Sequence, residues 1–180
     1  MGKGANFSSP LRVDGVTVVD EGGNIMGPIS ATAGSIGSTE LAENTIQTAT
    51  VTLTAAEIVG TAAGDIGHAS GAVLVAAPGA GKILEFVSAV LSYDFDTAAY
   101  TGGGDDLVIR QGTTAVSAAI AKADLLGDSA DDIAYVNALS AADIKLTANS
   151  TINLAGTAYT NPGTAAGTLK VHVMYRVHSA

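Results

Sequence analysis

The sequence predicts a mainly β protein: a jelly-roll-like β-sandwich of about seven to eight short strands, with an extended N-terminal arm and one or two short helices. The densest apolar stretch, Gly71–Phe95, is interrupted by proline and glycine, as two strands separated by a turn would be. From Thr48 onward, turn signals recur roughly every 8 to 15 residues. The last segment, Leu169–His178, alternates apolar and polar residues, which is typical of a strand with one buried face.

The apolar stretch is expected to form the centre of the fold. Val73–Val75 is one apolar run, Pro78–Gly81 breaks it, and Ile83–Leu91 is a second run. Two such runs around a turn predict a pair of buried strands, hydrogen-bonded to each other. The second run is apolar on both of its faces, so we expect it to lie between two packed layers.

The chain before the sandwich is polar and rich in small residues. We therefore expect residues 1–47 to be an extended arm or linker and residues 48–180 to be the sandwich domain. Within the arm, Val13–Asp20 is predicted as a short strand, with a turn at Glu21–Asn24 and a return at Ile25–Met26.

The sandwich begins with an alternating strand at Thr48–Thr54. A capping box, with Thr54 as N-cap and Glu57 three residues later, then predicts one or two helical turns to about Val59. The residue pattern of Thr113–Leu126 does not decide its secondary structure, and we favour a short helix near its end. Further short strands are predicted at Leu107–Arg110, Ile133–Val136, Asp143–Ala148 and Ile152–Ala155.

The composition limits the classes of function. The formal net charge is −9 and the pI is about 4.4, so a basic footprint for nucleic acid or an anionic membrane is not expected. There is no cysteine, which fits assembly in a reducing cytoplasm. Large side chains are few, with 3 Phe, 5 Tyr and no Trp. A thin core of this kind predicts burial completed by association with other copies.

Two motifs with catalytic associations lack essential residues. Ala77–Lys82 resembles a phosphate-binding loop, but Ala76 replaces its first glycine and Ile83 replaces the magnesium-binding Ser or Thr. His172 and His178 share a strand face but lie roughly 20 Å apart along the strand, too far to share a metal ion. We therefore expect no enzymatic activity and no cofactor.

Clustered aspartates offer oxygen ligands for a hard cation, and calcium is a weak candidate. One cluster flanks a glycine-rich loop and the other precedes a predicted strand, and neither has the spacing of an EF-hand. Paired carboxylates also occur in glycosidases, but aromatic platforms are scarce here. A solvated acidic surface is the expected outcome. The calcium candidates are Asp94, Asp96, Asp105 and Asp106; the second cluster is Asp124, Asp128, Asp131 and Asp132.

The N-terminal arm is basic on an otherwise acidic chain, because its first twelve residues hold two cations and no acid. Two interpretations stay open: a frayed terminus, or an arm that docks on an acidic partner surface. In the second case, the candidate residues for a capsid or subunit interface are Lys3, Phe7, Leu11, Arg12, Val13, Ile25 and Ile29.

The segment from Thr52 to Gly104 resembles small structural proteins of bacteriophage virions. The resemblance lies in the TAAEI opening at Thr54–Ile58, LVAAPGAGK at Leu74–Lys82 and YDFDTAAY at Tyr93–Tyr100. Ser38–Ile46 similarly looks like linkers of phage fibre and virion proteins. The match covers about a third of the chain and carries no catalytic residues, so it implies a location in the virion more than a mechanism.

Two functions are therefore expected from the architecture and this resemblance. The first is a capsid decoration or cement protein, a homotrimer that binds the major capsid protein on the virion surface through its N-terminal arm and is assembled in the host cytoplasm. The alternative is a fibre or tail-tip module that recognises a host cell-surface glycan.

Overall fold

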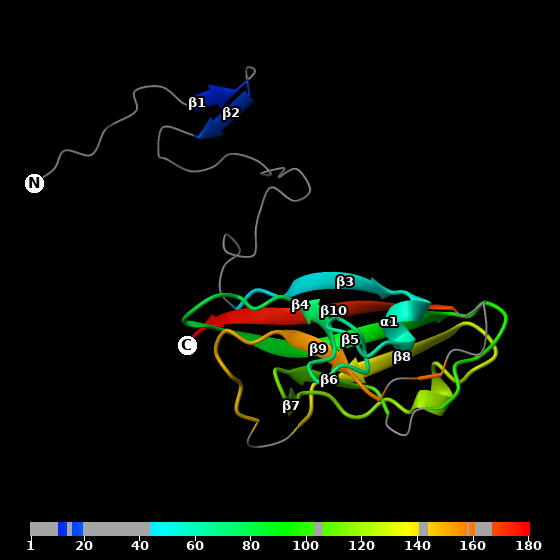
Figure 1. Cartoon of the computed structure of the whole chain (residues 1–180). Helices are drawn as coiled ribbons and strands as arrows, with labels where there is room; N and C mark the ends of the chain where they lie inside the picture. Colours follow the sequence, from blue (N-terminus) through cyan, green and yellow to red (C-terminus); the bar gives the residue numbers. More distant parts are fainter. Residues whose placement is uncertain are drawn as a thin grey trace, which may run out of the picture. The chain divides into compact units, whose positions relative to one another are not determined.

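The computed structural model describes residues 11–13, 16–19, 44–102, 106–140, 144–157, 159–160 and 167–180. The chain divides into two compact units, Met1–Glu40 and Leu41–Ala180. In the first unit, β1 (Leu11–Val13) and β2 (Val16–Val19) form a two-stranded antiparallel sheet (Figure 1).

This hairpin differs from the predicted one. The predicted strand Val13–Asp20 is only partly right, because β2 covers Val16–Val19 of it while Val13 belongs to β1 and pairs with Val16. Asp14-Gly15, a dipeptide favoured in two-residue hairpin turns, stands between the two strands in the sequence. The predicted return at Ile25–Met26 lies outside the described residues.

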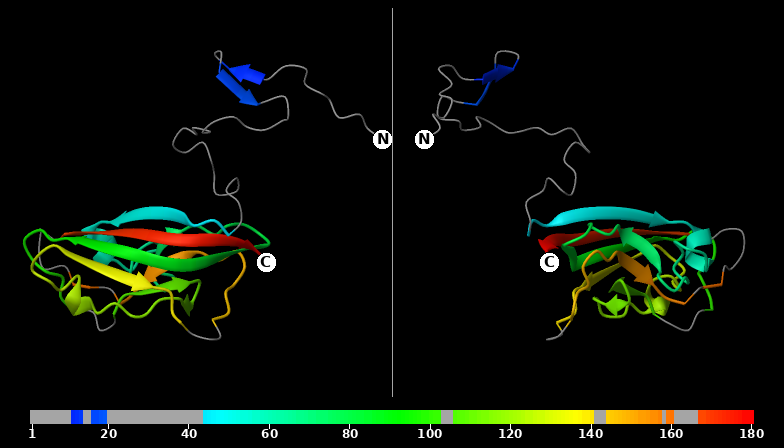
Figure 2. Two further views of the ribbon diagram at one scale, coloured as in Figure 1. Left: turned by 180° about the vertical axis from the view of Figure 1, so that it is seen from behind. Right: turned by 60° about the vertical axis from the view of Figure 1, so that its left-hand side comes forward.

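In the second unit, the described residues form two four-stranded antiparallel sheets that lie face to face, as Figure 2 shows. The longer sheet has the order β3 (Gln47–Leu53), β10 (Thr168–Ser179), β5 (Lys82–Asp94) and β8 (Asp132–Asn137). The shorter sheet has the order β4 (Ala72–Val75), β9 (Ile152–Ala155), β6 (Val108–Gln111) and β7 (Thr114–Ala115).

The strand pairing of this unit is nested. The first strand pairs with the last (β3 with β10), and the second pairs with the last but one (β4 with β9). The third pairs with the sixth (β5 with β8), and the fourth pairs with the fifth (β6 with β7). Two further pairings, β10 with β5 and β9 with β6, close each sheet. A long antiparallel ribbon wrapped into two sheets in this way is a jelly roll. The predicted jelly-roll-like β-sandwich is therefore confirmed.

The prediction that Val73–Val75 and Ile83–Leu91 pair with each other is wrong. The first run is β4 and the second lies within β5, and these strands belong to different sheets. The glycines of the break, with φ of 101° at Gly79 and 73° at Gly81, turn the chain from one sheet to the other. Each run instead pairs with strands from the second half of the chain, because the ribbon is folded back on itself.

The alternation predicted for the last strand is confirmed by β10. Its inward residues are 8% exposed or less, and they form part of one core cluster with the inward residues of both sheets. On the opposite face the polar residues are exposed or partly exposed. The inward residues of β10 are Leu169, Val171, Val173, Tyr175 and Val177.

The short helices agree with the expectation. α1 (Ala55–Val59) carries the predicted capping box, in which the Glu57 carboxylate accepts from the Thr54 backbone N–H at 2.7 Å. η1 (Lys122–Asp124), a 3₁₀ turn, lies near the end of the ambiguous Thr113–Leu126 stretch. No helix among the described residues is long and apolar enough to cross a membrane.

The predicted strand Asp143–Ala148 is wrong, since the described residues 144–148 have no strand pairing. The backbone of this segment is hydrogen-bonded at Thr147 by the side chain of Gln111. The Gln111 amide, 1% exposed, donates to the carbonyls of Leu84 (3.1 Å) and Thr147 (3.0 Å) and accepts from the Thr147 backbone N–H (2.8 Å). One buried amide therefore ties β6, β5 and the segment before β9 together.

We predict that Gln111→Leu lowers the free energy of unfolding by about 3 kcal/mol, because it leaves two carbonyls and one N–H without their partner. Chemical denaturation of the full chain measures this. Asn137→Leu, an amide-to-leucine change on exposed β8, serves as the control and should change stability by less than about 0.5 kcal/mol. Equal losses in both variants would contradict the role given to Gln111.

Candidate functional site

The second unit has two distinct ends along the β5–β10 pair. At one end, which we call the terminal end, the Asn44 N–H donates to the Val177 carbonyl (3.1 Å) and the Ala180 N–H donates to the Gly81 carbonyl (2.8 Å). The twelve register pairs between the strands place the opposite limit at Thr168 and Asp94, roughly 35 Å away. We call this second limit the loop end. The first and last described residues of the second unit thus lie at the same end of the domain.

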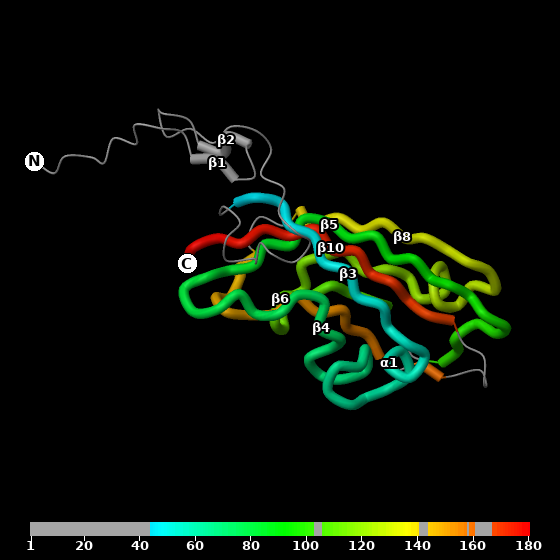
Figure 3. The backbone as a smooth tube through the Cα atoms, turned by 90° about the horizontal axis from the view of Figure 1, so that it is seen from above, coloured from blue at the N-terminus to red at the C-terminus, as the bar shows by residue number. Residues whose placement is uncertain are grey.

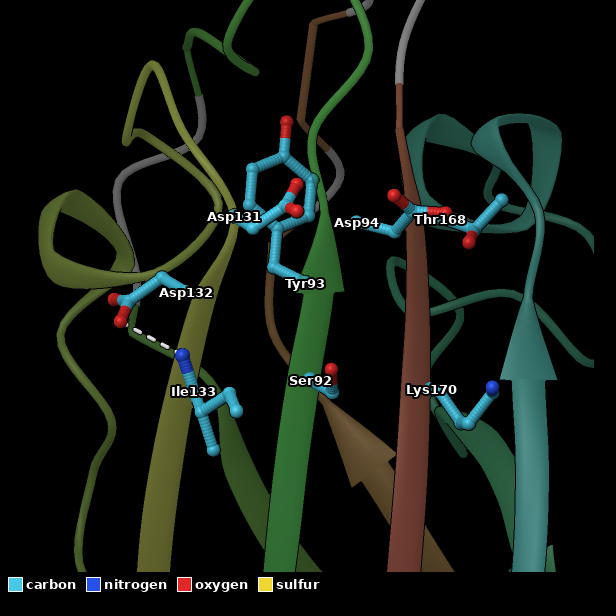
Figure 4. Close-up of a pocket in the computed structure, with 8 residues that line it drawn as sticks. All are labelled: Ser92, Tyr93, Asp94, Asp131, Asp132, Ile133, Thr168 and Lys170. Carbon is cyan, nitrogen blue, oxygen red and sulfur yellow. Dashed lines mark hydrogen bonds between the residues drawn. The ribbon is translucent and has the colours of Figure 1, made fainter.

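A hollow of about 560 Å³ lies at the loop end, on the outer side of the longer sheet (Figure 4). Most of its lining is polar, with three carboxylates, one ammonium group and two hydroxyls in addition to the tyrosine. The lining residues are Ser92, Tyr93, Asp94, Asp131, Asp132, Ile133, Thr168 and Lys170.

The strand register explains how these residues meet. Tyr93 pairs with Asp132 across β5 and β8, and Asp94 pairs with Thr168 across β5 and β10. The turn before β8 is held against the end of β5, because the Asp131 carboxylate accepts from the Phe95 backbone N–H at 2.9 Å. In the sequence the aspartates form two separate clusters. The antiparallel register brings Asp94 of the first cluster close to Asp131 and Asp132 of the second.

Three lining residues, Ser92, Thr168 and Lys170, were not predicted as site residues from the sequence. The only sequence signal for Ser92 and Lys170 is the alternation of β5 and β10, which places each of them on the outer face of its strand. The register then sets the two residues opposite each other. Alternation identifies a face but not the partner strand, so the hollow could not be derived before the register was known. What the hollow offers chemically is a polar, mainly anionic surface for hydroxyl or amino groups.

An aromatic cluster supports the loop end from inside. The Tyr93 and Tyr100 rings, both 1% exposed, lie 6.1 Å apart, and Phe95 lies edge-on to Tyr93 at 6.3 Å. The Tyr100 hydroxyl donates to the Gly167 carbonyl at 2.7 Å. Burial, with a smaller contribution from Tyr93, raises the pKa of Tyr100 to about 12. Burial also raises the pKa of Tyr93, reinforced by Asp128, Asp131 and Asp96.

The calcium candidates are only partly placed. Asp94 ends β5 in the hollow, Asp96 follows it in an exposed loop, and the Asp106 carboxylate accepts from the Lys122 N–H at 3.2 Å. Asp105 lies outside the described residues, so the four-residue site stays a prediction. Within the described part of the chain, no three side chains of the Asp, Glu, His or Cys type converge on a point that could hold a metal ion.

The three histidines bind different neighbours. His172 Nδ1 lies 2.9 Å from the Thr50 hydroxyl, and His68 Nδ1 lies 2.6 Å from the Ser70 hydroxyl. His178 Nε2 lies 2.7 Å from the Glu85 carboxylate, which Arg176 also contacts at 3.3 Å. Each imidazole therefore has a separate local partner.

The interface candidates of the arm fall largely outside the described residues, namely Lys3, Phe7, Ile25 and Ile29. The other three, Leu11, Arg12 and Val13, make up β1. The backbone register pairs Arg12 with Thr17 and Leu11 with Val19. A two-stranded hairpin of this size is at best marginally stable in water without another surface to pack on.

The chain is similar to few known proteins in the comparisons of sequence and structure. No protein-family model matches the chain, and no curated protein matches it. A chain from the solved structure titled "Cyanophage Pam1 capsid asymmetric unit" is similar, with 18% identity and a TM-score of 0.37, over 83% of this chain and 93% of that one. At this TM-score the likeness carries no argument about fold or function.

We predict that stability falls as the pH rises from about 10 to about 12, because the unfolded Tyr100 ionises near 10.0 while the folded one resists ionisation up to about 12. Tyr100→Phe loses its bond to Gly167, so it should be less stable than wild type at pH 8. Between pH 8 and pH 12, the free energy of unfolding of Tyr100→Phe should then fall by less than that of the wild type. Denaturation series at pH 8, 10 and 11.5 measure both effects. An alkaline loss that Tyr100→Phe leaves unchanged would contradict this account.

Proposed function

We propose that this chain is a structural protein of a bacteriophage virion: a capsid decoration or cement protein. In this proposal it binds the major capsid protein on the capsid surface as a homotrimer through its N-terminal arm, and it is assembled in the host cytoplasm. Its role is binding rather than catalysis. The resemblance of residues 52–104 to small virion proteins supports the location, and the jelly roll is a fold that viral capsid proteins use. Lectins use the same fold, so the fold alone does not decide.

The proposal rests mainly on where the described part of the second unit begins and ends. Asn44 and Ala180 both lie at the terminal end, held by the Val177 and Gly81 carbonyls. The described part of the domain therefore begins at the end opposite the hollow. Such a layout suits a knob whose arm binds a lattice, because several arms held in one oligomer bind repeated sites with avidity.

Exposed apolar side chains support association between copies. Ile133 and Tyr135 on β8 are 67% and 63% exposed, and Met174 on β10 is 40% exposed. The outer face of the longer sheet carries all three, since they alternate with the buried residues of their strands. Contact with another copy would remove this apolar surface from water.

We predict that deleting residues 1–30 abolishes binding to capsids while the sandwich stays folded, because in this proposal the arm supplies the contact, whereas the described core residues all belong to the second unit. Cosedimentation with capsids that lack the protein measures binding, and circular dichroism measures the fold. The substitution pair Lys3→Ala and Arg12→Ala should weaken binding by roughly tenfold if the basic arm meets an acidic surface. Lys170→Ala, which removes a cation from the loop end, is the matched control. Full occupancy by the truncated chain would refute the arm-based attachment.

One observation favours the alternative of a fibre or tail-tip module that binds a host glycan. The hollow lies at the loop end, opposite Asn44 and Ala180, and presents hydroxyl and carboxylate groups, which are the groups that bind sugar hydroxyls. An outward-facing polar hollow on a virion protein would suit such a ligand.

If the alternative holds, the protein binds host cells or oligosaccharides, and Asp94→Asn weakens that binding by at least tenfold because a lining acceptor is lost. Asp124→Asn, an exposed aspartate outside the hollow, should have no effect. A chelator reduces binding only if calcium takes part. Binding to empty capsids with none to cells would leave decoration as the function.

A further inference from the structure

β3 forms one margin of the longer sheet, and among the described residues it is paired on one side only, with β10. Its seven residues, Gln47–Leu53, pair with β10 without a register shift, and Figure 3 shows β3 as the outermost strand of that sheet. The sequence QTATVTL contains no charge, no proline and no glycine. An edge with these properties presents free backbone donors and acceptors and has nothing that prevents another strand from pairing with it.

The other three sheet margins each have a feature that discourages pairing. β4 has a register shift between Val73 and Val75, β7 is only two residues long, and β8 begins with the charged Asp132. Bulges, short length and charge are the usual means of protecting an edge. β3 has none of them.

Burial along β3 shows that its free side is open within the described part of the chain. Ala49 and Val51 face the core but are only partly buried, whereas Val171 and Val173 on the neighbouring strand are 0% exposed. Ile46, just before the strand, is 50% exposed. A strand added beside β3 would therefore cover apolar surface in addition to pairing the backbone.

The sequence of β3 is complementary to itself about its midpoint, Thr50. If a second copy of β3 lies antiparallel with the two midpoints opposed, threonine meets threonine at three positions on the outer face. On the inner face, Ala49 meets Val51 of the other copy in both directions. Directly opposed Thr–Thr pairs stabilise antiparallel sheets, and no like charges meet in this register. A two-fold interface requires a patch that is self-complementary in this way.

We propose that β3 is a self-association site, at which two copies of this chain pair antiparallel about Thr50 and join their longer sheets into one continuous sheet of eight strands. This inference does not depend on the proposed virion function. A two-fold contact cannot close a trimer, so in a trimeric protein it links copies that belong to different trimers. Trimers linked in this way would form a net.

Cysteine cross-linking tests the register, since the chain has no cysteine of its own. In the proposed pairing, the two Thr50 side chains are directly opposed, with Cβ atoms about 5 Å apart, within reach of a disulfide. Full-length Thr50→Cys should form covalent dimers under mild oxidation. Thr48→Cys alone should not, because its two copies lie roughly 13 Å apart along the strand. A mixture of Thr48→Cys and Thr52→Cys should form dimers.

A failure of Thr50→Cys to cross-link, or equal cross-linking by Thr48→Cys alone, would overturn the proposal. As an independent measurement, Thr50→Lys places two ammonium groups opposite each other and should weaken association at least tenfold in sedimentation velocity. Thr50 is exposed, so the fold should survive. Ser129→Lys, which adds the same charge at an exposed turn outside β3, is the matched control and should leave association unchanged. An equal loss of association in Ser129→Lys and Thr50→Lys would show that added charge, and not the pairing of β3, causes the loss, and would overturn the proposal.

Discussion

The antiparallel pairing of β5 with β10 runs through twelve register pairs at the centre of the longer sheet, and most other features depend on it. It joins the middle of the chain to its last strand, so the ribbon must fold back on itself. The inward residues of β10 are then packed between the two sheets, where they are 8% exposed or less. The same register separates the terminal end from the loop end, because Ser179 pairs with Lys82 at one limit and Thr168 with Asp94 at the other.

The proposed function rests on this polarity of the domain. The terminal end receives the chain at Asn44, and the loop end carries the acidic hollow over a buried pair of tyrosines. In the proposed function, a domain that is attached to the capsid at its terminal end leaves its loop end accessible to other molecules. On the sides of the sandwich, β3 presents an uncharged edge, and the outer face of β8 presents the exposed side chains of Ile133 and Tyr135.

Local chemistry in the sequence predicted much of the fold. Alternation identified β3 and β10, and the Thr54–Glu57 capping box identified α1, because these signals depend on neighbouring residues alone. The pairing of β4 with β5 was predicted wrongly, since adjacency in sequence favours a hairpin and cannot reveal a ribbon folded on itself. The strand predicted at Asp143–Ala148 failed because the Gln111 side chain, distant in sequence, bonds to the Thr147 backbone instead. The hollow was missed because only the register brings Asp94, Asp132 and Lys170 together.

The central claim, that the terminal end faces the capsid and the loop end faces outward, is tested most directly by cryo-electron microscopy of capsids decorated with labelled protein. One form carries a compact tag after Ala180, and the other carries it in the exposed turn after Ser129. The account predicts that the tag after Ala180 lies close to the shell and the tag after Ser129 lies at a radius roughly 30 Å larger. The reverse order of radii, or no density for either form on the capsid, would contradict it.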